Sequence, residues 1–433
     1  MSYFIYLFIF LYLFILIKRV KQQKYNPKQN YIYDLESNYI KTISIQHNQL
    51  PIDIEKDLTL FLKVELLFNP LSYLFRPYIQ IDGIKHSFEY GAIGYRYINL
   101  SHATNGVIKT KFIRYSEKNL RLYGFKNNID KKDKTLVIAP HADDAELAGF
   151  GLYKSQEDVT IVTITAGENG VCNYCSLYNN KYIATLQKAK LRAFDAITVP
   201  MLADVDIQNS VALGYFGSTL EDMRCNPTQE VYSHIDNIHT TQEFRKVTHS
   251  SFNLKEQVKP TYNSLKNDLE TILLTTKPKL ILTPHPAIDS HKDHKESTYL
   301  IIELILKLNL NTKLLLYTNH LVTDELYPLG EIGEYITLPP NFKIFPYDSL
   351  YSFSLDKELQ NDKYFAIEAM HDLRDSLLWI STKKVAKLLQ KRIKNQIFSK
   401  NKSYFRRSVR ANELFFVAYK RDTLEQLLQM KNA

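Results

Sequence analysis

One stretch of the sequence, TLVIAPHADDAELAG at Thr135–Gly149, constrains the fold and the function of this chain more than any other. It begins with an apolar run typical of a buried strand, stops at Pro140 and continues into residues that favour a helix. Between the two lie the polar side chains of His141, Asp143, Asp144 and Glu146. Ligands bind at the carboxyl ends of strands in open α/β sheets. The simpler alternative is a solvated loop in which Asp143 or Asp144 caps the next helix.

A second stretch, LILTPHPAIDSHKDH at Leu280–His294, repeats this order. A short apolar run and a proline are followed by the side chains of His285, Asp289, His291, Asp293 and His294. Two strands of one sheet that each end in His and Asp can bring these groups to one point. Histidine nitrogen and carboxylate oxygen are the ligands of catalytic zinc, which takes three protein ligands and leaves a fourth position open. The two stretches together predict a zinc site at the carboxyl edge of a sheet.

The spacing within each stretch is compatible with such a site. His141 and Asp144 are three residues apart, so they share a face where the turn is helical. His291 and His294 repeat the same spacing. We interpret His285, directly after the strand, as a rim or structural residue and not as a ligand.

These motifs resemble those of a known family. PHADDAE resembles the P-H-x-D-D-x-E signature of the LmbE-like, or PIG-L, family of zinc-dependent N-deacetylases. DSHKDH resembles the family's second signature, H-x-D-H, which an Asp often precedes. The resemblance covers roughly Asp130 to Leu300, with weaker echoes beyond. It implies an α/β catalytic domain with Zn²⁺ as its cofactor.

The resemblance also implies roles for the polar residues of the first motif. His141 and Asp144, together with His294 of the second motif, would be the zinc ligands. Asp143 would be the general base that takes a proton from the attacking water. Glu146 would support the site from the first turn of the following helix.

In the second motif, His291 would stabilise the oxyanion or protonate the leaving amine. Asp293 would orient a neighbouring imidazole, as carboxylates near metal ligands commonly do. Substrate contacts are expected from three further residues, which are Glu168, Arg192 and His320.

Each of these substrate contacts has its own basis. Glu168 lies in a glycine-punctuated loop after the strand Val159–Thr165 and resembles the family's T-x-G-E-x-G; an ordinary loop is the alternative. Arg192 matches the family's R-x-x-E helix, although Asp195 replaces the Glu. His320 follows another apolar strand, so it is either a pocket residue or a structural one.

The order of strands and helices predicts the architecture of residues 131–433. We expect a Rossmann-like, mostly parallel sheet with helices on both faces. An insertion at about residues 215–260 would form a lid or substrate wall, and the C-terminal part would be helical and basic.

Residues 36–130 have a different pattern, with short β-type runs and no long helical period. Asp82-Gly83 between two such runs is a hairpin signal. We predict a small all-β, sandwich-like domain. Its many Tyr and Phe residues either form core and cross-strand pairs or stack on sugars.

The N-terminus predicts an association with a membrane. Residues 1–17 are almost wholly apolar and are followed by a basic and polar linker at residues 18–35. We expect a retained membrane anchor, with an interfacial helix or a signal peptide as alternatives. Since the basic residues follow the apolar run, the positive-inside rule places the catalytic domain in the cytoplasm.

Charge and cysteine content add two expectations. The net charge is +9, and residues 383–410 are dense in Lys and Arg. With no nucleic-acid-binding motif, we do not expect a nucleic-acid partner. We interpret the basic stretch as docking on a membrane surface or on a phosphate-bearing lipid-linked substrate, or else as an ordinary solvated helix face. We interpret Cys172 and Cys175, a C-x-x-C pair beside the site, as free thiols.

These observations predict an enzyme. We expect a membrane-anchored hydrolase of linear amide C–N bonds that uses Zn²⁺ to remove the N-acetyl group from an N-acetylated sugar or glycoconjugate, including lipid-linked ones. One alternative is an amidase of the same fold acting on a non-sugar metabolite. Another is a non-catalytic, membrane-anchored glycan-binding or scaffold protein. The sequence leaves the oligomeric state open.

Overall fold

The structure is a computed structural model, and it describes most of the chain between Lys24 and Asn432. The described residues are Tyr6, Phe10 and residues 24–45, 47–50, 58–117, 120–170, 177–235, 237–373 and 407–432. In these ranges no helix is both long enough and apolar enough to cross a membrane. The predicted anchor, the C-x-x-C pair and most of the basic stretch 383–410 lie outside them.

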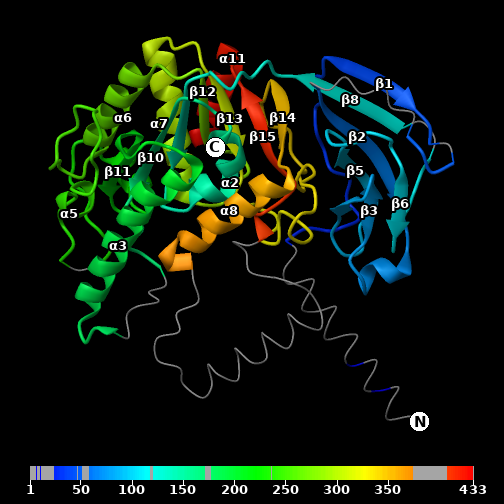
Figure 1. The fold of residues 1–433 in the computed structure, drawn as a ribbon, viewed down its shortest axis with the longest axis horizontal. Helices are drawn as coiled ribbons and strands as arrows, with labels where there is room; N and C mark the ends of the chain where they lie inside the picture. Colours follow the sequence, from blue (N-terminus) through cyan, green and yellow to red (C-terminus); the bar gives the residue numbers. More distant parts are fainter. Residues whose placement is uncertain are drawn as a thin grey trace.

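The main sheet has seven strands in the order β11-β10-β9-β12-β13-β15-β14 (Figure 1). The strands are β9 (Thr135–Ala139), β10 (Val159–Thr165), β11 (Ser210–Tyr215), β12 (Leu280–Pro284), β13 (Lys313–Tyr317), β14 (Ser349–Ser354) and β15 (Asn412–Ala418). The first five in this order are parallel, while β15 and β14 run antiparallel to their neighbours. The prediction of a mostly parallel sheet is therefore confirmed.

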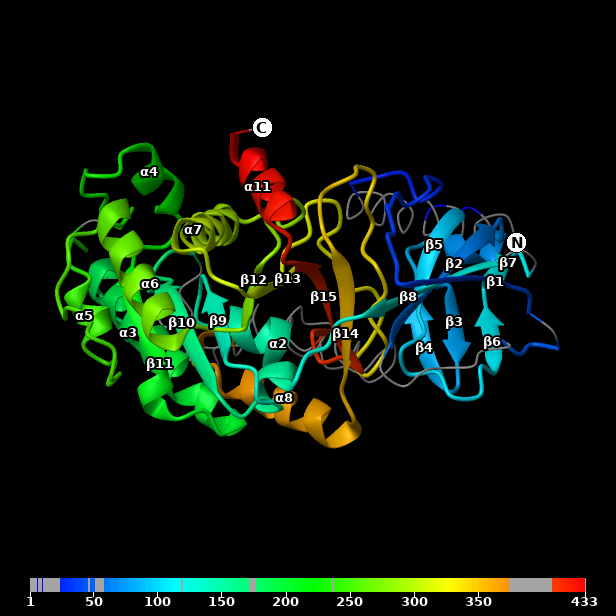
Figure 2. The ribbon, with the colours of Figure 1, turned by 90° about the horizontal axis from the view of Figure 1, so that it is seen from above.

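Helices cover both faces of this sheet, as predicted. They are α2 (Asp144–Lys154), α3 (Lys181–Thr198), α4 (Leu220–Cys225), α5 (Gln242–Arg245), α6 (Tyr262–Thr276), α7 (Lys292–Leu308), α8 (Lys357–Ala369) and α11 (Arg421–Gln429). Short 3-10 helices are η1 (Pro70–Tyr73), η3 (Val199–Ala203), η4 (Ile207–Asn209), η5 (His371–Leu373) and η6 (Met430–Asn432). Figure 2 shows α7 and α11 on one side of the sheet and α2 and α8 on the other.

The strands form where they do because their apolar runs are buried on both faces. Every residue of β9 is buried; Leu136 and Ile138 pack with α6 and α7, while Val137 packs with α2 and α8. Helix α2 lies unusually close to β12, since a Cβ at Gly149 would come within 2.6 Å of Leu282 Cδ2. The helix is kinked at this glycine. The close packing holds the first turn of α2 against the sheet edge.

The N-terminal β-type region folds into two antiparallel sheets. Its strands are β1 (Tyr39–Ile43), β2 (Leu58–Leu67), β3 (Tyr78–Ile81), β4 (Ile84–Ser87), β5 (Gly94–Asn99), β6 (Ile108–Lys111), β7 (Arg114–Tyr115) and β8 (Leu120–Lys126). One sheet is β1-β8-β2-β5 with β7 beside β2, and the other is β4-β3-β6. Residues of both sheets, such as Leu62 and Ile79, share one apolar core. The Asp82-Gly83 hairpin is present, with Ile81 paired to Ile84.

The β region packs against the antiparallel end of the main sheet (Figures 1 and 2). Phe61 and Phe125 from the β region belong to the same apolar cluster as Phe345 and Phe416 from the α/β region. The part of the predicted linker that is described, from Lys24, runs through this junction, where Tyr31 is only 5% exposed.

Candidate metal centre and active site

The site is assembled by the two stretches that follow β9 and β12. These strands are parallel neighbours, so their carboxyl ends lie side by side. His141 lies in the short turn between β9 and α2, and α2 begins at Asp144. His291 is the N-cap of α7, which places His294 in the first turn of that helix. The sheet register thus brings together residues 150 positions apart in the chain.

Three atoms at the centre of the site form a nearly equilateral triangle. His141 Nδ1 lies 3.1 Å from Asp144 Oδ2, and His294 Nε2 lies 3.1 Å from the same oxygen. The two histidine nitrogens are 3.2 Å apart. Three ligands of one tetrahedral zinc, each about 2.0–2.2 Å from the metal, face one another at a similar separation. The chemistry and spacing of this donor set fit a zinc ion.

Two further histidines lie beside the triangle. His291 joins His141 and His294 in a group whose possible donor atoms lie within 4.8 Å of one another. His320 forms a similar group with Asp144 and His294. Both therefore border the same centre.

Each member of the triangle is held from behind by another polar group. His294 Nδ1 lies 3.1 Å from Asp289 Oδ2, and Asn319 Nδ2 donates to Asp144 Oδ1 at 2.8 Å. His141 Nε2 is 3.3 Å from an oxygen of Asp293. Such bonds fix the orientation and tautomer of a metal-binding imidazole. The donor set is thus ordered by the protein itself.

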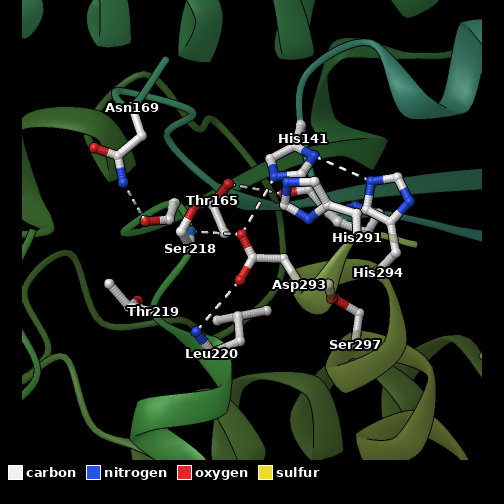
Figure 3. A network of polar contacts seen from close by, with 12 residues as sticks. His141, Thr165, Asn169, Ser218, Thr219, Leu220, His291, Asp293, His294 and Ser297 are labelled. Atoms are coloured by element: carbon white, nitrogen blue, oxygen red, sulfur yellow. Dashed lines mark hydrogen bonds and ion pairs between the residues drawn. The ribbon is translucent and has the colours of Figure 1, made fainter. Parts of the chain in front are cut away.

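Asp293 is in turn held by the loop that follows β11 (Figure 3). The backbone N–H of Ser218 donates to Asp293 Oδ2 at 2.6 Å, and that of Leu220 donates to Oδ1 at 3.4 Å. Figure 3 shows the carboxylate between these amides and the ring of His141. The start of the predicted insertion therefore supports the site.

The electrostatics of the centre favour positive charge. Burial alone would lower the pKa of His141, but hydrogen bonds to Asp144 and Asp293 raise it to about 9. Burial is likewise outweighed at His294, whose pKa lies well above its usual value because of Asp144 and Asp289. Burial opposes ionisation of Asp144, yet the two histidines hold its pKa well below the usual range. A centre that stabilises protonated histidines by these carboxylates is also suited to a divalent cation.

Asp143 and His291, the residues predicted to act on the substrate, have different partners. Arg192 Nη2 donates to Asp143 Oδ1 at 3.3 Å. Arg192 reaches it by passing over Gly167, whose φ is +60° and where a Cβ would lie 2.3 Å from Arg192 Nε. The His291 ring is 4.6 Å from that of His141, and burial with its charged neighbours lowers its pKa to about 4. At neutral pH Asp143 is therefore beside a guanidinium, and His291 is a neutral imidazole.

The remaining predicted site residues lie further from the triangle. Glu168 is buried, and its carboxylate accepts from Gly217 N at 3.0 Å and from Ser233 Oγ at 2.8 Å, which ties two loops together. Glu146 is buried against the Tyr153 hydroxyl at 3.2 Å, and burial raises its pKa to about 8.

His285 was interpreted as a rim or a structural residue, and the structure supports the second of these. It is fully buried and packs edge-on against Phe345 and Phe416, so it is a structural residue and does not lie at the rim.

Sequence reasoning missed the roles of two residues. Asp289 was visible in the second motif, but nothing local indicated that it reaches His294. Asn319 follows the strand β13, directly before the predicted His320, and a strand end in an α/β sheet was the available signal. Asn319 joins two separate strand ends, whereas Asp289 contacts His294 within the segment that follows β12.

The geometry defines the class of this domain as α/β with a His–Asp centre at the carboxyl edge of a parallel sheet. Residues 136–305 match the model of the PIG-L family, described as GlcNAc-PI de-N-acetylase. The match agrees with the resemblance of the two motifs to the PIG-L (LmbE-like) family over this part of the chain. A comparison with curated protein sequences gives no match.

Several solved structures show a distant similarity. The A40926 pseudoaglycone deacetylase Dbv21 is 16% identical, with 67% of this chain and 98% of that chain covered and a TM-score of 0.36. The N,N'-diacetylchitobiose deacetylase from Pyrococcus horikoshii is 16% identical, with 66% and 84% covered and a TM-score of 0.32. The zinc-inhibited form of teicoplanin deacetylase Orf2 is 16% identical, with 67% and 99% covered and a TM-score of 0.35. TM-scores below 0.5 do not establish that two chains share a fold.

Proposed function

We propose that this protein is a zinc-dependent N-deacetylase that hydrolyses the acetamido group of an N-acetylated sugar. The observation that carries the proposal is the triangle of His141 Nδ1, Asp144 Oδ2 and His294 Nε2, with sides of 3.1, 3.1 and 3.2 Å. These three residues would hold the ion. Bound zinc supplies Lewis-acid activation of both water and the amide carbonyl.

In the proposed reaction Asp143 is the general base. Asp143 directly precedes the ligand Asp144 in the chain, and its carboxylate takes the proton of the attacking water. Arg192, 3.3 Å from Asp143 Oδ1, orients this carboxylate before the reaction. An ion pair that is only partly exposed acts more strongly than one in open solvent.

The neutral imidazole of His291 supports the transition state. Its ring lies 4.6 Å from that of His141, so it borders the proposed metal centre. A ring N–H in this position donates a hydrogen bond to the oxyanion, and such bonds contribute most when they are already oriented. Asp293 is a positioning residue, since it bonds His141 and not the reacting atoms.

We further propose that the substrate carries N-acetylglucosamine and can be lipid-linked. The description of the matched family names GlcNAc-PI as a substrate, which supports this class. The apolar sequence of residues 1–17 supports attachment of the protein to a membrane, with the catalytic domain on the cytoplasmic side.

The test combines metal content with acetate release by the full chain. Wild type and Asp143→Asn are incubated with N-acetylglucosamine, N,N'-diacetylchitobiose and GlcNAc-phosphatidylinositol. We expect one zinc per chain in both proteins, and a loss of acetate release by roughly 10²–10⁴-fold in the variant because the base is gone. Asp362→Asn, in a surface ion pair with Lys154, is the matched control and should keep full activity.

The outcomes separate the parts of the proposal. Zinc without acetate release from any substrate would contradict the substrate class and leave the metal centre. Absence of zinc from purified, folded wild type would contradict the catalytic proposal as a whole.

A further inference from the structure

One end of the β region exposes an apolar surface. Four large apolar side chains at the end of β2 and in the following turn are 42–58% exposed, namely Leu67, Phe68, Leu71 and Phe75. Phe75 stacks on Phe112, with ring centroids 4.7 Å apart. We call these four residues and Phe112 the tip patch. A cluster of exposed apolar groups marks an interaction surface more often than a single exposed side chain does.

Basic residues surround the tip patch. In the sequence from Leu67 to Ile81, Arg76 is the only charged residue, and Val107–Ser116 contains three basic residues and no acidic one. Arg114 is directly opposite Leu67 across the β2–β7 pair, and Lys111 is opposite Tyr78 at the start of β3. Lys85 lies over the Tyr78 ring at 4.8 Å. Basic residues therefore predominate around the patch, while the exposed Glu65 and Glu117 lie just beyond it.

The tip patch lies on the same side of the molecule as the active site. At the patch end of β2, Leu66 pairs with Gly94, and the neighbouring Ile93 N–H donates to Pro27 O at 3.0 Å. Slightly earlier in the chain, Lys24 N donates to Thr323 O at 3.3 Å. Thr323 follows the carboxyl end of β13, the edge that carries the site.

Figure 1 shows this common side. Helix α11 follows β15 directly and lies at the top, so β15 ends at the top. Strand β13 is antiparallel to β15, and its carboxyl end therefore points downward in this view. The blue turn η1, which contains Leu71, lies at the lower end of the β region.

We infer that the tip patch is a docking surface for an anionic lipid bilayer. Its aromatic and aliphatic side chains would enter the interfacial layer, where aromatic rings are favoured. Arg76, Lys85, Lys111 and Arg114 would contact the phosphates of the headgroups, which attract basic side chains. Docking in this orientation turns the carboxyl edge of the main sheet toward the membrane. The inference concerns binding, and it holds whether or not the proposed deacetylation is correct.

The experiment places a tryptophan in the patch of the full-length chain. Phe68→Trp is mixed with vesicles of phosphatidylcholine and phosphatidylserine whose acyl chains carry bromine, which quenches tryptophan at short range. The native chain contains one tryptophan, Trp379, so the emission of the wild-type protein gives the background signal from this residue. We expect strong quenching of the new tryptophan. Phe75→Trp is a second probe in case Phe68→Trp folds poorly.

Val107→Trp is the matched control. Val107 is 40% exposed and adjoins β6 at the end opposite Lys111. We expect its emission to remain unquenched on the same vesicles. If the patch tryptophan is unquenched while the protein is bound to vesicles, the patch does not enter the bilayer and the inference is wrong. Equal quenching of both positions, or no binding at all, would also overturn it.

A charge variant tests the basic surroundings. Lys111→Gln with Arg114→Gln in the Phe68→Trp chain removes two basic residues, and each contributes about fivefold to binding of an anionic surface. We expect the apparent affinity for the vesicles, measured from the quenching at limiting lipid, to fall by roughly 25-fold. Unchanged affinity, or equal quenching on purely zwitterionic vesicles, would contradict an anionic partner.

Discussion

Two clusters of buried histidines in this protein have opposite properties. At the carboxyl edge of the main sheet, His141 and His294 each lie within 3.3 Å of two carboxylates. In the β region, His86 and His102 lie with their ring centroids 5.1 Å apart. In the described part of the chain no carboxylate bonds either of these two rings.

The surroundings of the second cluster, His86 and His102, resemble those of an apolar core. His86 is fully buried, and neither of its ring nitrogens has a partner in the described residues. Its neighbours include the ring of Tyr335, 5.6 Å away. Burial, with a smaller contribution from His102, holds the pKa of His86 well below its usual value. This side chain therefore stays neutral in the folded protein.

The comparison shows what turns a buried histidine into a metal ligand. Burial alone disfavours the charged form and leaves a neutral ring that packs like an apolar group. Adjacent carboxylates reverse the effect, because they orient the ring and stabilise positive charge beside it. Burial and residue type are shared by both clusters, so the carboxylates make the difference.

The largest expected effect is loss of a ligand. His294→Gln removes one corner of the triangle, so we expect zinc to be lost and acetate release to fall by at least about 10³-fold, as for loss of a metal-activated nucleophile. Metal analysis of the dialysed protein and an acetate assay measure both. His86→Leu is the matched variant and should keep its zinc; a loss of zinc there would erase the distinction between the clusters.

The second-largest effect is expected from loss of the carboxylate that holds the ligand His294. Asp289→Asn leaves the triangle in place but weakens the hold on His294, which should lower zinc affinity by about 10–100-fold. Competition with a chromogenic chelator gives the affinity. Asp289→Glu should restore part of it if the carboxylate acts by positioning; an unchanged affinity in Asp289→Asn would show that the ring needs no such partner.

Part of the pH dependence of stability should come from the second cluster. The folded-state pKa of His86 lies below its unfolded value of about 6.5, so its stability contribution is complete above pH 6.5 and falls as the pH decreases below it. The slope for one histidine is at most about 1.4 kcal/mol per pH unit. Urea unfolding of wild type and His86→Leu between pH 7.5 and 5 should give a shallower decline in the variant. Equal declines would show that another group accounts for it.

The smallest effect is expected at pH 8 for the same variant. His86→Leu replaces an unpartnered, neutral ring by an apolar group of similar size, and the free energy of unfolding should change by less than about 1.5 kcal/mol. A much larger loss, measured by urea unfolding, would mean that the imidazole nitrogens have partners and that the cluster is polar.

Much of the fold was predictable from local patterns. The run Thr135–Gly149 predicted the strand β9, the turn and the start of α2. Asp82-Gly83 predicted the hairpin between β3 and β4, in which Ile81 pairs with Ile84. Such features depend on neighbours in the chain, so the sequence specifies them directly.

By itself the sequence determined which chemical groups stand at the ends of which strands, and hence the family and the candidate ligands His141, Asp144 and His294. Only the tertiary structure decided that Asn319 holds Asp144, that the backbone N–H of Ser218 holds Asp293, and that residues near Lys24 lie beside the site edge. The physical reason is distance along the chain. Apolar periodicity and turn chemistry act over a few residues, whereas these contacts join segments that become neighbours only when the sheet has formed.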